Sequence, residues 1–161
     1  MSVSAVRRIV VGVDGTAESA AALHWACREA TLRRAEVHAI HVREAPCHSV
    51  ASYAVPSQGY PEDVDVDIMW GSVLPERTPG VRVRTEVADG LAARVLLERC
   101  TGADMLVLGT AGDMPGAGWS PGPVIRACLR RAPCPVVVIS AEREPSGLGA
   151  DEHRVPVPAG A

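Results

Sequence analysis

The chain has 161 residues, a length that suits one domain with a sizeable core rather than two domains. Apolar residues make up 47% of the chain but aromatic residues only 3%, so its core has to be built from Val, Ile, Leu and Ala, as in buried parallel sheets. A formal net charge of -3 gives no electrostatic reason to expect a nucleic acid or an anionic membrane as a partner, and no stretch is long enough to span a bilayer.

The first part of the chain predicts a strand, a helix and a second strand. The run Arg7–Val13 is mostly apolar and β-branched, which predicts a strand. Turn residues follow, and Thr16 is expected to cap a helix that runs to about Arg34, because its hydroxyl can accept a bond from a free first-turn N–H. Apolar residues occur on both faces of Glu36–Arg43, which predicts a buried second strand.

The segment between Glu44 and Gly80 interrupts this pattern. It holds five prolines, and the element that fits is a short helix around Val64–Leu74. We expect the rest to be a weakened, mobile connection, since long structureless loops are uncommon inside compact domains. Three aspartates here are spaced like calcium ligands, but Ile68 and Leu74 occupy the positions that need Gly and Glu, which favours a solvated acidic stretch.

The second part of the chain continues the alternation of strands and helices. Val81–Val87 alternates apolar and charged residues and predicts a third strand. Asp89 is expected to cap the next helix, which Gly102 would end. Met105–Leu108 predicts a short buried strand that leads into a glycine-rich loop.

A last helix and a last strand complete the predicted domain. They are expected at Pro123–Arg131 and Val136–Ile139. Prolines bracket the entry to the last strand, which predicts that it lies at a sheet edge. An uncovered apolar edge is a template for pairing with another chain, so we expect a homodimer joined through this strand. The Pro-, Gly- and charge-rich residues 142–161 predict a disordered tail, so the domain is expected to span residues 1–141.

This alternation of strands and helices predicts an α/β fold, a doubly wound five-stranded parallel sheet with helices on both faces. Ligands in such sheets bind at the carboxyl ends of the strands, where the winding direction switches. The loops after the first and fourth strands, 14–16 and 109–122, are therefore the expected site. His41 is expected to face this site from the end of the second strand.

Other features bear on location and catalysis. The start of the chain does not resemble a signal peptide, and the five cysteines form no Cys-x-x-Cys pair, so we expect reduced thiols in the cytoplasm. The sequence has no phosphate-loop lysine and no paired carboxylates at strand ends. We therefore expect no enzyme, with slow ATP hydrolysis assisted by Asp14 as the upper limit.

Three glycines after the fourth strand carry the clearest functional signal. Gly109, Gly112 and Gly122 precede a helix, and glycines let backbone N–H groups approach a ligand while a helix N-terminus favours an anion. This segment, with IVVGVDGTAESAAALHWACREA before it, ADMLVLGTAG around its start and CPVVVI after it, resembles the universal stress protein family. The resemblance covers residues 7–43 and 81–140.

The resemblance implies a flavodoxin-like, adenine nucleotide alpha hydrolase-like sheet with strand order 3-2-1-4-5, and a homodimer through Val136–Ile139. In the ATP-binding branch of the family the glycine loop wraps the phosphates and ribose, so ATP with Mg²⁺ is the implied cofactor. By position, Asp14 would face the nucleoside and the Val42 backbone would contact adenine. The full set of implied nucleotide-binding residues is Gly12, Asp14, Val42, Leu108, Gly109, Gly112, Gly122, Pro123 and Val124.

The chain departs from the family pattern at the phosphate position. Pro123 stands where the pattern has Ser or Thr, and proline has neither a hydroxyl nor a backbone N–H. Residues 109–124 include Asp113 but no Lys or Arg. Each hydrogen bond lost to a charged group costs on the order of 1.5–3 kcal/mol.

Two functional hypotheses therefore stay open. One is an ATP-responsive, homodimeric stress regulator, and the other is a nucleotide-independent stress protein that acts through protein interaction. A flavin-binding protein is a less favoured third class, because the loop after the first strand offers only Thr16 and Ser19 as hydroxyls for a flavin phosphate.

Overall fold

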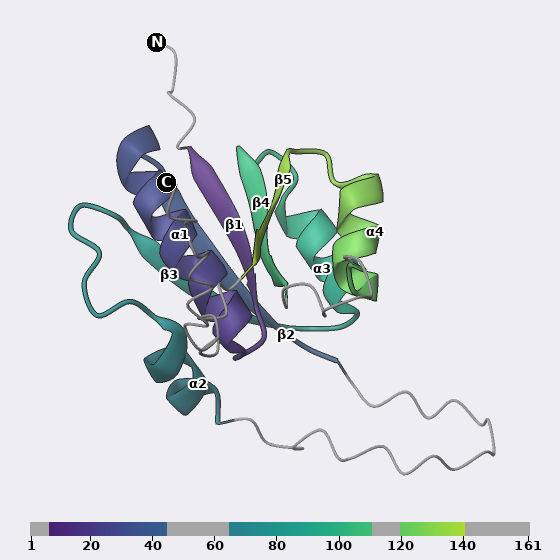
Figure 1. The fold of residues 1–161 in the computed structure, drawn as a ribbon, viewed down its shortest axis with the longest axis horizontal. Coiled ribbons are helices and arrows are strands. Elements are labelled where there is room, and N and C mark those ends of the chain that lie inside the picture. Colours follow the sequence, from purple (N-terminus) through teal and green to yellow (C-terminus); the bar gives the residue numbers. More distant parts are fainter. Residues whose placement is uncertain (1–6, 45–64, 111–119, 141–161) are drawn as a thin grey trace, which may run out of the picture.

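Five parallel strands form one sheet in the order β3-β2-β1-β4-β5, which confirms the predicted doubly wound arrangement (Figure 1). The computed structural model describes residues 7–44, 65–110 and 120–140. The predicted edge position of the last strand is confirmed, as is a helix within 64–74. The elements are β1 Arg8–Val13, α1 Ala17–Arg33, β2 Glu36–Arg43, α2 Val66–Val73, β3 Val83–Asp89, α3 Ala92–Arg99, β4 Met105–Thr110, α4 Pro123–Arg131 and β5 Val136–Ser140.

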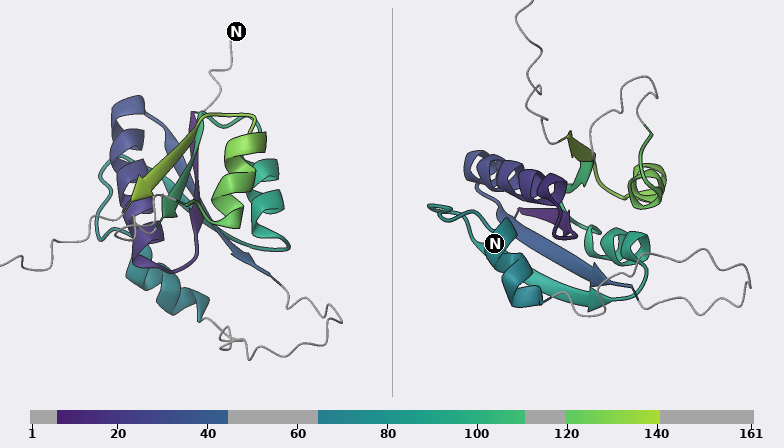
Figure 2. Two further views of the ribbon diagram at one scale, coloured as in Figure 1. Left: turned by 45° about the vertical axis from the view of Figure 1, so that its right-hand side comes forward. Right: turned by 60° about the horizontal axis from the view of Figure 1, so that its bottom comes forward.

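Two apolar layers hold the sheet between its helices. Side chains alternate along a strand, so Ile9 and Val11 of β1 pack into the layer under α1 and α2, and Val10 packs into the layer under α3 and α4. All three are fully buried, as expected for a central strand of a parallel sheet. The right-hand view of Figure 2 shows α1 on one side of the sheet and α3 and α4 on the other.

Helix α1 begins and packs as its sequence predicts. Thr16 is the N-cap, and its hydroxyl oxygen accepts a hydrogen bond from the Ser19 N–H at 3.2 Å. Small side chains at Ala22, Ala26 and Ala30 are fully buried and let the helix axis lie close to β1 and β4. This close approach brings the first turn of α1 against Gly109 of β4.

The third strand and its following helix differ from the prediction. The ladder with β2 pairs Val37 with Val83 and Arg43 with Asp89, so β3 covers 83–89 rather than 81–87, because the extent of its partner determines where pairing begins and ends. Asp89 therefore does not cap α3. Its carboxylate is bound to Arg43, and the N-cap of α3 is Leu91, which makes no side-chain cap hydrogen bond.

Two smaller features complete the framework. Strand β4 extends to Thr110, which places Gly109 inside the strand rather than in the loop after it. Asp65 caps α2 by accepting hydrogen bonds from Asp67 and Ile68 N–H groups, in keeping with a structural role for this acidic stretch. Within the described residues, no helix is both long and apolar enough to cross a membrane.

Candidate functional site

A cleft of about 250 Å³ opens at the carboxyl ends of β1, β2 and β4, the switch point of the sheet. The first turns of α3 and α4 close its sides. Its lining comes from segments that are far apart in the chain, and consists of Gly12, Val13, Asp14, Ser19, Ile40, Val42, Ala92, Leu96, Leu108, Gly109, Gly122, Pro123, Val124 and Ile125.

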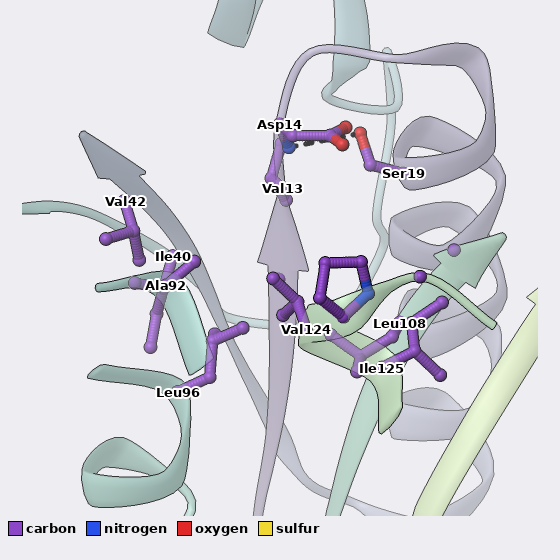
Figure 3. A pocket seen from close by; sticks show the side chains of 14 residues that line it. Val13, Asp14, Ser19, Ile40, Val42, Ala92, Leu96, Leu108, Val124 and Ile125 are labelled. Atoms are coloured by element: carbon purple, nitrogen blue, oxygen red, sulfur yellow. Dashed lines mark hydrogen bonds between the residues drawn. The ribbon is translucent and has the colours of Figure 1, made fainter. Parts of the chain in front are cut away.

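Two apolar walls face each other across this cleft (Figure 3). One is made by side chains at the end of β2 and the start of α3, and the other by side chains of β4 and the start of α4. Such walls suit a flat, largely apolar ring held between aliphatic side chains. The first wall consists of Ile40, Val42, Ala92 and Leu96, and the second of Leu108, Val124 and Ile125.

Asp14 is the carboxylate of the lining and lies just beyond the end of β1. Its Oδ1 accepts hydrogen bonds from the backbone N–H and the hydroxyl of Thr16, and its own N–H donates to Ser19 Oγ at 3.3 Å. Desolvation alone would raise the pKa of Asp14, but the hydrogen bonds from Thr16 and Ser19 outweigh it, so the pKa is lowered from its ordinary value of 3.8. Asp14 is therefore ionised at neutral pH.

The glycines of the lining serve different purposes. A Cβ built on Gly109 would overlap the carbonyl group of Glu18 and lie 2.8 Å from the backbone nitrogen of Ser19, so this glycine lets the first turn of α1 touch β4. A Cβ on Gly12 would lie 2.8 Å from the side chain of Leu108. Gly122 has nothing within 4 Å of its Cβ position. Packing of the described residues therefore explains Gly109 but not Gly122.

The first turn of α4 carries the departure from the family pattern. Pro123 is the first residue of the helix and Gly122 is its N-cap, without a side-chain cap hydrogen bond. Proline suits this place because its φ is preset and its missing N–H would have no partner within the helix. Arg126, one turn on, is exposed and donates from Nη2 to the Pro121 carbonyl oxygen at 3.2 Å.

The structure brings eight of the nine implied residues to this one cleft, and the ninth, Gly112, lies outside the described residues. Sequence reasoning missed six lining residues, although the alternation in β2 places Ile40 on the same side as Val42. The prediction that His41 faces the site is wrong. Its Nδ1 is hydrogen-bonded to the Val13 carbonyl oxygen at 2.9 Å, and it alternates with Val37 and Ala39, which face the opposite layer. The six missed residues are Val13, Ser19, Ile40, Ala92, Leu96 and Ile125.

Comparison with known proteins agrees with this arrangement. The sequence model described as the Universal stress protein family matches residues 5–140. The chain belongs to the universal stress protein family. Universal stress proteins of Mycobacterium tuberculosis and Mycolicibacterium smegmatis are each 32% identical to it, over 83% and 92% of this chain. The chain spans about half the length of these relatives, 48% and 52% respectively.

Solved universal stress protein structures share the fold. One from Archaeoglobus fulgidus has a TM-score of 0.61 at 20% identity, covering 84% of this chain and 99% of that one. A universal stress protein in complex with cAMP has a TM-score of 0.59 at 19% identity, covering 86% and 100%. An Archaeoglobus fulgidus protein in complex with dAMP has a TM-score of 0.52 at 20% identity, covering 83% and 97%.

Proposed function

We propose that this universal stress protein binds an adenine nucleotide in the cleft and acts in the cytoplasm as a homodimeric, non-enzymatic stress regulator whose surface depends on nucleotide occupancy. The observation that carries the proposal is the convergence of eight family-pattern residues on one cleft at the switch point of the sheet. Two structures of the same fold hold adenine nucleotides, cAMP and dAMP, which supports this ligand class.

The residues present fit the nucleoside part of the ligand. The aliphatic walls can hold the base, and the Asp14 carboxylate can accept hydrogen bonds from ribose hydroxyls. ATP with Mg²⁺ is the form that the family pattern implies. Asp14 is the lining residue that could contact the metal, and within the described part of the chain no group of three His, Cys, Asp or Glu side chains could hold a metal ion.

The test is a calorimetric titration with adenine nucleotides on matched glycine variants. Gly122→Leu adds a bulky side chain at a lining residue whose Cβ position has nothing within 4 Å, and it is expected to abolish binding. Gly71→Leu is the control, since Gly71 is also open around its Cβ but lies in α2, under the opposite face of the sheet. No heat and no thermal shift with millimolar nucleotide for the unaltered chain would refute the proposal.

The dimer rests on the exposed edge of β5. Its residues are only partly buried within the single chain and are largely Val and Ile, which makes the edge suitable for a second copy. Sedimentation equilibrium is expected to give a dimer, and Val138→Lys is expected to weaken it because a charged residue blocks edge pairing. A monomer at high protein concentration would refute this assembly.

The second hypothesis, a nucleotide-independent regulator, is favoured by one observation. Pro123 at the first position of α4 removes a hydroxyl and an N–H that the family pattern places near the phosphates. This alternative predicts a dimer that binds none of adenosine, AMP or ATP. The same titration therefore separates the two hypotheses.

A further inference from the structure

Two positive groups near the mouth of the cleft, among the described residues, already have partners within the protein. No described residue of the lining is basic. Arg43 follows the lining residue Val42, but its guanidinium is paired with Asp89 at 2.9 Å and 3.1 Å. Arg126 donates to the Pro121 carbonyl oxygen. A phosphate at the cleft would have to compete with these partners for either guanidinium.

At two helix starts beside the cleft, one of the N–H groups that usually bind anions is missing or already engaged. Pro123 has no N–H at the start of α4. At the start of α3, the Ala92 N–H donates to the Glu44 carboxylate at 2.7 Å. The start of α4 therefore offers one N–H fewer than usual, and one N–H at the start of α3 already binds an anionic side chain.

The hydroxyl groups beside the cleft have internal acceptors as well. The Thr16 hydroxyl donates to the Asp14 carboxylate, and the Ser19 hydroxyl donates to the Thr16 carbonyl oxygen at 3.0 Å. Neither hydroxyl can donate to a phosphate without losing its present bond.

Two carboxylates of the described residues lie at or beside the opening. Asp14 lies in the lining, and Glu44 is bonded to the lining residue Ala92. Like charges about 4 Å apart repel by about 1 kcal/mol even at the dielectric constant of water, and by more in a partly dry cleft. Each phosphate added to a ligand therefore brings negative charge toward carboxylates without gaining a described cation.

We infer that the cleft selects adenine ligands of low phosphate charge, so that adenosine and AMP bind more tightly than ATP. This inference rests on the proposed adenine site and names its ligand class. It reverses the order expected from the family pattern, in which the phosphates add binding contacts. The nucleoside is held by the two aliphatic walls and Asp14, and the triphosphate adds repulsion.

The test is isothermal titration calorimetry of the full chain with adenosine, AMP and ATP, at one ionic strength, with and without Mg²⁺. We expect adenosine and AMP to bind at least about tenfold more tightly than ATP, which corresponds to about 1.4 kcal/mol. If ATP binds more tightly than adenosine, the inference is overturned and the adenine site stands. If none of the ligands binds, the proposed function fails and the inference fails with it.

Two variants test whether the missing N–H at Pro123 and the engaged N–H of Ala92 disfavour ATP. Pro123→Ser supplies a hydroxyl and an N–H at the start of α4, and Glu44→Ala frees the Ala92 N–H. Each is expected to raise the ratio of ATP affinity to adenosine affinity about tenfold, the effect of one added charge-assisted hydrogen bond. Pro133→Ser is the matched control, because Pro133 precedes β5 at the opposite end of the sheet. An equal change of the ratio in the control, or no change in both test variants, would contradict the assignment.

Discussion

Gly109→Ala tests the close contact between β4 and α1. The added Cβ would overlap the Glu18 carbonyl group and approach the Ser19 nitrogen to 2.8 Å. These are backbone atoms and cannot rotate away, so the strand and the helix must separate by a few tenths of an ångström or more. Overpacking a core costs about 1–3 kcal/mol, and a backbone obstacle places this substitution at the upper end, about 3 kcal/mol.

The assay is thermal and urea unfolding monitored by circular dichroism. A loss of about 3 kcal/mol lowers the midpoint of a domain of this size by roughly 6–12 °C. Gly122→Ala is the matched control, since its Cβ meets nothing within 4 Å, and it is expected to cost no more than about 1 kcal/mol, the effect of replacing a glycine N-cap by alanine. If the two variants are equally stable, the contact between β4 and the first turn of α1 is not as described.

Two further predictions concern the titrating groups. Thr16→Ala removes the N-cap of α1 and is expected to cost about 1 kcal/mol by urea unfolding, while the Asp14 pKa rises toward 3.8 in an NMR titration; an unchanged Asp14 pKa would contradict the role of the hydroxyl. Hydrogen bonds from Arg99 lower the pKa of Glu86 below its ordinary 4.5, so the ionised carboxylate stabilises the fold above pH 4.5 and loses this effect as the pH falls through the lowered value. The stability difference between the unaltered chain and Glu86→Gln should therefore shrink in acid, and a difference independent of pH would count against this ion pair.

The positions of the strands along the chain were predictable because the hydrophobic pattern is local, whereas their order in the sheet was implied by the family resemblance. The two-sided apolar pattern of Glu36–Arg43 is enough to indicate a buried strand, and the structure has a strand with those bounds. The limits of β3 were not predictable, because they follow from its register with β2, 46 residues away at the Arg43 and Asp89 pair. The local sequence predicts Asp89 as a helix cap, because its place in β3 depends on that same pairing with β2.

The location of the site was predictable from the sequence, but the contacts that its residues make were not. The spacing of the glycines and the end of β1 indicate the cleft, and Gly122 and Asp14 do lie in its lining. The reason for Gly109 was hidden, because it lies in a contact with Glu18, which is far away in the chain. The engagement of the Ala92 N–H by Glu44 likewise joins residues 48 positions apart. Such pairings depend on tertiary structure and leave no local sequence signal.

An NMR titration of the ¹⁵N-labelled chain with AMP tests the central claim most directly. The account predicts that amide shifts concentrate at the ends of β1, β2 and β4 and at the start of α4, including Asp14, Val42 and Val124. Amides at the opposite end of the sheet, such as Ala103 and Val136, should stay unchanged. Shifts centred at that opposite end, or none with millimolar AMP, would contradict a nucleotide site at the switch point.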